Sequence, residues 1–82
     1  MNVVKRSGAR EPVSFDQILQ RLQALCGSLS HVDPVVVAQR TIQGLRDGIT
    51  TTELDTLAAE TAAYMSTTHP EYGLFAARIS LS

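Results

Sequence analysis

The feature that most constrains the fold is a pair of short extended segments joined by a tight turn at the start of the chain. Val3 and Val4 are β-branched and favour a strand. Ser7-Gly8 is a turn signal, because glycine tolerates the positive φ that tight hairpins need. A second extended segment is expected at 11–13, where Pro12 cannot donate to a ladder and so favours a very short or edge strand. The sequence therefore predicts an N-terminal β-hairpin.

A helix is predicted directly after this hairpin. Ser14 is a typical N-cap, and Gln17 three residues later completes a capping box. Val13 and Ile18 stand at the two positions of a hydrophobic staple. Apolar residues then recur at helical spacing across residues 15–26. The hairpin is thus fastened onto a helix with no linker between them.

The hairpin carries three of the seven cationic residues of the chain, Lys5, Arg6 and Arg10. Side chains alternate along a strand, so Lys5 and Arg6 point to opposite faces and reach one ligand together only at the hairpin edge. One interpretation is a small lid over an anionic ligand. The other is a pair of solvated charges at an exposed strand end, and spacing alone leaves both open.

A second helix is predicted to begin at Asp33-Pro34, with aspartate as N-cap and proline at the first helical position. The run 35–37 is three valines, which are also compatible with a strand. The cap and the length to Leu45 favour a helix. Its expected buried face is Val35, Ala38, Ile42 and Leu45.

Two more helices complete the predicted architecture. Thr50 and Glu53 have capping-box spacing at the start of the third, and Pro70 opens the fourth. Their expected buried faces are Leu54, Leu57, Ala58, Ala62 and Met65, and then Tyr72, Phe75, Ala76 and Ile79. The predicted fold is mainly α, a short β-hairpin capping a four-helix bundle.

Asp55 is a charged residue on a face of the third helix that is expected to meet protein rather than water. It lies one turn before Ala58 and Ala59, whose small side chains allow another helix to approach closely. An acidic residue in the first turn is also favoured by the helix dipole. A binding role and this electrostatic role are equally compatible with the spacing.

Composition excludes several classes of function. A chain of 82 residues is expected to form one domain, and its net charge of −1 argues against general nucleic-acid binding. There is no apolar run near eighteen residues, so we expect a soluble, non-secreted chain without a membrane segment. Cys26 is expected to be a buried structural thiol. His31, expected to face solvent, and His69 fall in separate breaks between helices, so no catalytic residue and no metal site is predicted.

Four segments match one family in order. They are 3–8, the set Glu11, Phe15-Asp16 and Ile18, the run 48–63, and Pro70-Glu71-Tyr72 with 76–79. Together they resemble the ATP-cone, the allosteric nucleotide-binding domain at the N-terminus of many ribonucleotide reductase large subunits. The resemblance spans the whole chain and looks closest to the eukaryotic-type class I enzyme.

The resemblance implies ATP or dATP as an allosteric effector, with Mg²⁺, bound between the hairpin and the helices. The backbone of 4–6 would read the adenine edge, and Glu11 and Asp55 would lie near sugar or phosphate. Thr51 would offer a hydroxyl and a helix-start N–H group. Asp55 would also correspond to a position at which, in such domains, the responses to ATP and to dATP diverge. The nucleotide-binding positions that the resemblance implies are Val4, Lys5, Arg6, Glu11, Ser14, Gln17, Thr51 and Asp55.

The implied function is control of the overall activity of a reductase that makes deoxyribonucleotides from ribonucleoside diphosphates. ATP would favour activity, and dATP would favour an inhibited oligomer of large subunits. The parent would be a cytoplasmic oxidoreductase with a small-subunit partner, and 1–82 would be its N-terminal fragment. Two features depart from the family: Gln17 stands where many members have lysine, and a basic contact from a longer fourth helix would lie beyond Ser82.

Other interpretations come from different classes of protein. A helical protein–protein interaction module would show no nucleotide response and would tolerate substitution of Lys5 or Asp55. The cone of a transcriptional repressor would be preceded by a zinc ribbon, and the single cysteine, Cys26, argues against it. The cone of an anaerobic reductase fits the run 52–60 less well.

Overall fold

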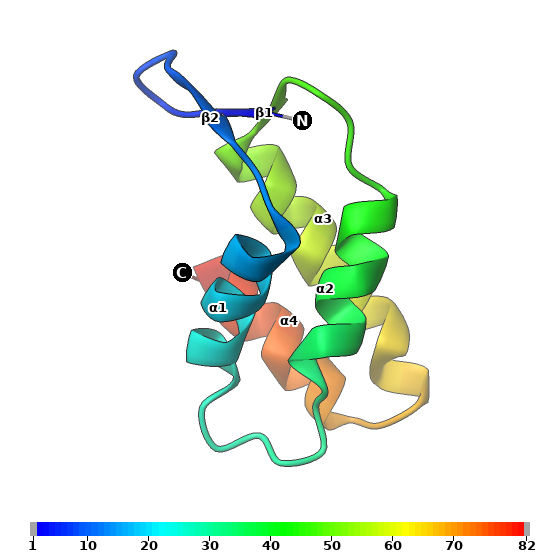
Figure 1. Ribbon diagram of the computed structural model, residues 1–82. Coiled ribbons are helices and arrows are strands. Elements are labelled where there is room, and N and C mark those ends of the chain that lie inside the picture. Colours follow the sequence, from blue (N-terminus) through cyan, green and yellow to red (C-terminus); the bar gives the residue numbers. More distant parts are fainter. Residues whose placement is uncertain (1, 82) are drawn as a thin grey trace.

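The computed structural model describes residues 2–81 and shows a small sheet at one end of a helical bundle (Figure 1). The elements in this range are β1 (Asn2–Val4), β2 (Arg10–Pro12), α1 (Phe15–Cys26), α2 (Pro34–Gln43), β3 (Ile49–Thr50), α3 (Thr51–Tyr64), the 3-10 turn η1 (Met65–Thr67) and α4 (Glu71–Leu81). The predicted fold, mainly α with an N-terminal hairpin over four helices, is confirmed for these residues. None of the helices described is both long enough and apolar enough to cross a membrane.

The hairpin consists of β1, β2 and the turn between them. Val3 pairs with Glu11 in antiparallel register, and the Gly8 N–H donates to the Lys5 carbonyl at 2.9 Å. Gly8 has φ +85°, the left-handed conformation that the turn requires and that glycine adopts without strain. Pro12 lies on β2, at the edge of the sheet, where its missing N–H costs no ladder bond.

A third strand, β3, joins the hairpin to the start of α3, and the sequence analysis did not predict it. Val3 pairs with Ile49 in parallel register, which gives the strand order β2-β1-β3. Asp47 Oδ1 accepts the Asn2 N–H at 2.8 Å, and the Gly48 N–H donates to the Asn2 carbonyl at 2.9 Å. The hairpin is therefore held against α3 by backbone pairing as well as fastened to α1 by the chain.

The predicted starts of α1, α2 and α3 are confirmed, whereas α4 begins at Glu71, one residue after the predicted Pro70. Ser14 Oγ accepts the Gln17 N–H while Gln17 Oε1 accepts the Ser14 N–H, each at 3.3 Å. Thr50 and Glu53 form the same reciprocal capping box at the start of α3. Asp33 caps α2 with Pro34 at its first position. Each helix start satisfies N–H groups that would otherwise lack a partner.

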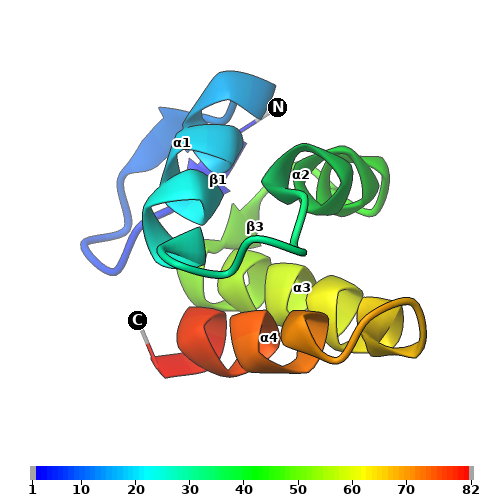
Figure 2. The ribbon, with the colours of Figure 1, turned by 90° about the horizontal axis from the view of Figure 1, so that it is seen from below.

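The core lies between two layers of helices, with α1 and α2 over α3 and α4 (Figure 2). Phe75 and Ile79 of α4 and Leu22 of α1 are at most 2% exposed and meet at its centre. Ala62 of α3 is fully buried. Its small side chain lets α3 and α4 lie side by side, as the alanine-rich stretch of α3 predicts.

Two details of packing differ from the sequence analysis. The buried face of α2 is turned so that Val37 and Thr41 point inward, whereas Val35, predicted to be buried, is 37% exposed. Thr41 is accepted in the core because its hydroxyl donates to the Val37 carbonyl at 2.7 Å. Cys26 is only half-buried, although burial still raises the pKa of its thiol against the opposing charge of Arg78.

Candidate functional site

Asp55 is the centre of the candidate site. It projects from the second turn of α3 towards α1, where its Oδ2 accepts a hydrogen bond from Arg21 Nη2 at 2.9 Å. The Asp55 side chain is 30% exposed, and burial raises the pKa of its carboxyl although the Arg21 guanidinium opposes that effect. The prediction that Asp55 faces protein is confirmed. A half-buried carboxylate beside an arginine can exchange this partner for a ligand.

A polar cavity of about 270 Å³ opens on one side of Asp55. It lies between the hairpin turn, which contributes Arg6, and the first two turns of α3. The end of α4 closes the third side. Its lining residues are Arg6, Thr52, Asp55, Thr56, Ile79 and Ser80. One cation, one carboxylate and three hydroxyl groups make this cavity suited to a polar or anionic group.

An apolar recess of about 120 Å³ lies on the other side of Asp55. It is lined by residues of α1 and α3, and Gln17 and Arg21 supply its polar edge together with Asp55. Its lining residues are Val13, Gln17, Ile18, Arg21, Leu22, Leu54, Asp55 and Ala58. Asp55 thus borders both spaces, and together they suit a ligand that has one apolar part and one polar part.

On the hairpin the structure separates the two adjacent cations. Lys5 Nζ lies 2.5 Å from Glu11 Oε2, and both side chains are about half exposed. Glu11 faces Val3 across the ladder, so Lys5 is its diagonal neighbour on the same side of the sheet. Arg6 instead lines the polar cavity. The two adjacent cations therefore point to different places, as the alternation predicts. Lys5 and Glu11 line neither space beside Asp55, and their roles in binding stay predictions.

The remaining predicted positions lie close to the same region. Val4 is half-buried at the end of β1, in register with Thr50. The Ser14 hydroxyl is occupied as the cap of α1. Thr51 is half-buried at the first position of α3, and the following residue, Thr52, is the one that lines the polar cavity. Roles for Val4, Ser14 and Thr51 in binding stay predictions.

The sequence analysis did not single out Arg21, the ion-pair partner of Asp55. It lies one helical turn after Gln17 and therefore on the same face of α1. That spacing was a usable signal, because a cation one turn beyond a predicted ligand position faces the same space. Its partner could not be read from the sequence, since Asp55 is 34 residues away.

His31 also differs from its prediction. Its side chain is 61% exposed, in agreement with a solvent-facing residue, but it is not isolated. His31 Nδ1 lies 2.8 Å from Glu71 Oε2, and its ring stacks on that of His69. None of these three side chains lines the recess or the cavity beside Asp55.

A helical bundle with a small sheet over a two-part recess defines a small ligand-binding module. Comparison with known families agrees with this class, because the model of the ATP cone domain matches residues 1–82. The chain belongs to the ATP-cone family, as its sequence motifs indicated. Membership of this family supports a nucleotide-binding regulatory role.

Curated relatives are ribonucleotide reductase large subunits. The chain is 56% identical over 87 residues to the ribonucleoside-diphosphate reductase large subunit of Dictyostelium discoideum, covering 100% of this chain and 10% of that protein. It is 54% identical over 84 residues to the corresponding large chain of Neurospora crassa and large subunit of Danio rerio, covering 100% of this chain and 9% and 11% of theirs. The chain thus spans about a tenth of the length of these relatives.

Proposed function

We propose that this domain binds ATP and dATP around Asp55 and thereby regulates the overall activity of a ribonucleotide reductase. The observation that carries the proposal is the meeting of an apolar recess and a polar cavity at one half-buried carboxylate. A nucleotide has the matching division into a flat, largely apolar base and a polar sugar with phosphates, and phosphates that extend past Asp55 would reach Gln17 and Arg21 at the polar edge of the recess. Membership of the ATP-cone family supports the same ligand class.

Cations and helix starts would hold the phosphates. Arg6 already lines the polar cavity, and its guanidinium is suited to bidentate contact with phosphate oxygens. The first turn of α3 begins at Thr51, so its N–H groups and the partial positive charge of the helix face the hairpin end of the site. Lys5 would leave Glu11 and join the phosphates at the hairpin edge. The backbone near Val4 would contact the adenine edge.

Mg²⁺ fits this arrangement as an ion carried by the nucleotide. Magnesium is held largely by phosphate oxygens and water, with one or two protein carboxylates. Glu11 and Asp55 are the carboxylates at the hairpin end of the site, and each has a cationic partner in this structure. A bound Mg²⁺ would supply charge neutralisation between these carboxylates and the phosphates, which would otherwise repel each other.

The regulatory part of the proposal concerns a longer protein. We infer a cytoplasmic reductase in which this domain is the N-terminal part of the large subunit. ATP would favour activity, dATP would favour an inhibited assembly of large subunits, and the small subunit would be a further partner. ATP and dATP differ by one 2′-hydroxyl, so their opposite effects require a different affinity for two conformations of the domain.

Isothermal titration of the 82-residue chain with ATP and with dATP, Mg²⁺ present, tests the binding. We expect one saturable site for each. Arg6→Ala should weaken both by about ten- to a hundred-fold, the loss of one charge-assisted contact of about 1.5–3 kcal/mol. Asp55→Asn should change the ratio of the two affinities, because a carboxylate is the stronger acceptor for a ribose hydroxyl.

Matched variants separate the site from general charge effects. Glu60→Gln removes one negative charge from an exposed position of the same helix, and Arg40→Ala removes one positive charge from an exposed position of α2. Both should bind as the unmodified chain does. Absence of saturable binding would contradict the proposal and favour the helical interaction module. If the Arg6 and Asp55 variants bind as tightly as the unmodified chain, the placement of the nucleotide around Asp55 is wrong.

A further inference from the structure

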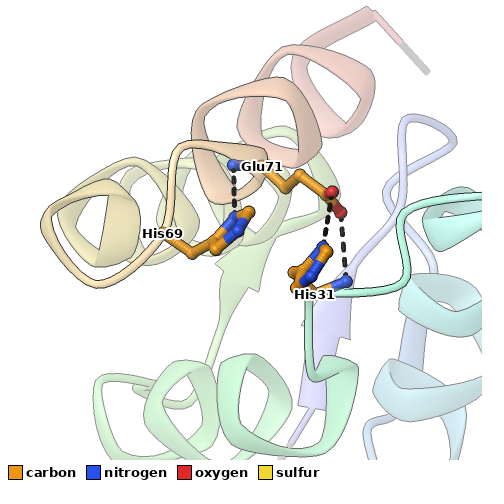
Figure 3. A group of neighbouring side chains, drawn as sticks. All are labelled: His31, His69 and Glu71. Carbon is orange, nitrogen blue, oxygen red and sulfur yellow. Dashed lines mark hydrogen bonds and ion pairs between the residues drawn. The ribbon is translucent and has the colours of Figure 1, made fainter.

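Three side chains with metal-ligating groups meet where the α1–α2 connector lies beside the start of α4 (Figure 3). Figure 1 shows this connector at the end of the bundle away from the hairpin. His31 comes from the connector between α1 and α2, His69 from the turn after η1, and Glu71 from the first position of α4. His69 and Glu71 are neighbours in the sequence, but His31 is 40 residues from Glu71, so only the fold brings His31 to them. One ligand atom of each lies within 4.8 Å of the other two.

The contacts among them already form a compact network. The Glu71 carboxylate accepts the His31 N–H at 3.1 Å through Oε1 and meets His31 Nδ1 at 2.8 Å through Oε2. His69 Nδ1 accepts the Glu71 N–H at 3.1 Å. The two imidazole rings are stacked, with centroids 4.3 Å apart and planes at 8°. Figure 3 shows both rings and the carboxylate gathered on one side of the α4 start.

We propose that His31, His69 and Glu71 form a binding site for a divalent first-row transition-metal ion, with Zn²⁺ as its representative. In a tetrahedral site with bonds of about 2.0–2.1 Å, neighbouring ligand atoms are about 3.3 Å apart. The present separations are at most 4.8 Å, so they need to shorten by no more than about 1.5 Å to reach this geometry. Two imidazole nitrogens and one carboxylate oxygen favour such an ion over Mg²⁺ or Ca²⁺, which prefer oxygen ligands.

Binding exchanges the present hydrogen bonds for coordination. The ion would take the place of the proton between His31 Nδ1 and the Glu71 carboxylate. His69 would give up the Glu71 N–H, and its ring would turn out of the stack so that a nitrogen lone pair faces the ion. The Glu71 N–H lies at the start of α4, where such donors have no intrahelical acceptor and can turn to water.

Three protein ligands leave a coordination position for water, so the site is open rather than closed. The effect of the bound ion would be to stabilise the fold. The ion would tie the α1–α2 connector to the start of α4, and an ion that binds only the folded chain stabilises it by mass action. The site is separate from the Asp55 cavities, and the proposal does not depend on nucleotide binding.

Titration of the chelator-treated chain with ZnCl₂ tests the proposal. We expect one Zn²⁺ per chain, a rise in the thermal midpoint on saturation, and at least tenfold weaker binding in His31→Ala, His69→Ala and Glu71→Gln. Cys26→Ser is the matched control, because it removes the thiol as an alternative zinc ligand and should bind Zn²⁺ unchanged. Saturable binding that survives a His31→Ala/His69→Ala double variant would overturn the assignment.

Nuclear magnetic resonance of the unmodified chain avoids any loss of folding in the variants. The ring signals of His31 and His69 should shift together and saturate at one equivalent of Zn²⁺. Signals of both rings that stay unchanged, or a shift confined to one ring, would overturn the three-ligand site.

Discussion

Gln17→Lys should lower the stability of the domain but tighten nucleotide binding. Gln17→Glu should keep or raise the stability and should not tighten nucleotide binding. Gln17 has two roles in the structure. Its Oε1 accepts the Ser14 N–H at 3.3 Å in the capping box of α1, and its side chain borders the apolar recess beside Arg21. Lysine cannot accept the Ser14 hydrogen bond but adds a cation next to the nucleotide. Glutamate keeps an acceptor and adds a negative charge.

The magnitudes follow from these contacts. Loss of one exposed capping hydrogen bond costs about 0.5–1 kcal/mol, and a cation in the first turn of a helix adds a few tenths through the helix dipole. The Gln17→Lys variant should therefore unfold about 5 °C lower, while Gln17→Glu should match the unmodified chain or exceed it. For ATP, a charge-assisted contact of about 1.5–3 kcal/mol corresponds to about ten- to a hundred-fold tighter binding by the lysine variant.

Thermal unfolding and isothermal titration of the three proteins measure both quantities. Gln23→Lys is the control, since it makes the same change in charge at an exposed position on a different face of α1. It should alter ATP affinity by less than about threefold at physiological salt, where exposed charges are largely screened. If Gln17→Lys does not bind ATP more tightly than Gln23→Lys, position 17 does not face the phosphates and the placement of the nucleotide is wrong.

Three further predictions concern packing, a helix end and acid stability. Ala62→Leu should cost about 1–3 kcal/mol in urea unfolding, because Ala62 is fully buried between α3 and α4, and an unchanged midpoint would mean that these helices can separate freely. Gly27→Ala should also cost about 1–2 kcal/mol, since Gly27 has φ +53° and an added Cβ would lie 2.8 Å from Arg78 Nη1; an unchanged free energy of unfolding would contradict this geometry. The hydrogen bond from the His31 ring lowers the pKa of Glu71, so this stabilisation is present above the ordinary glutamate pKa and is lost as the pH falls through the lowered value. Glu71→Gln should therefore reduce stability at neutral pH and flatten its decline in acid, and a decline as steep as in the unmodified chain would exclude this role.

Local rules were sufficient for the helix starts and for one complete helix. The bounds of α1 agree with its apolar spacing because Ser14 and Gln17 fix its start within four residues of sequence. The same holds for Thr50 and Glu53 at α3. Capping depends on neighbours along the chain, so the sequence contains all the information it needs.

Contacts between distant segments could not be predicted in the same way. β3 is two residues long and carries no periodicity of its own; it is a strand because Ile49 pairs with Val3. The orientation of α2 about its own axis depends on what packs against it. A small rotation about that axis exposes Val35 and brings Thr41 into the core. Asp55 was singled out by its face on α3, but its ion pair with Arg21 required the fold.

The Arg21–Asp55 pair makes a final prediction about how the nucleotide binds. Burial raises the pKa of Asp55, and Arg21 is the charge that opposes this effect. If a phosphate takes Arg21, Asp55 loses its cation and gains an anionic neighbour, so its pKa rises further and binding takes up a proton. If Mg²⁺ bridges Asp55 and the phosphates instead, the ion replaces the lost charge and no uptake by Asp55 follows.

Titrations in two buffers of different ionisation enthalpy, at a mildly acidic pH above the ordinary aspartate range, distinguish these modes, because a carboxyl whose pKa rises on binding takes up a proton there. The nucleotide itself also exchanges protons at this pH, so the informative quantity is the difference between the unmodified chain and Asp55→Asn. A difference that disappears when Mg²⁺ is added would indicate the bridged mode, and one that persists would indicate direct capture of Arg21. Equal proton exchange by both proteins, with and without Mg²⁺, would show that the nucleotide leaves the Arg21–Asp55 pair intact. The conformational change that distinguishes ATP from dATP would then have to begin at the hairpin rather than at Asp55.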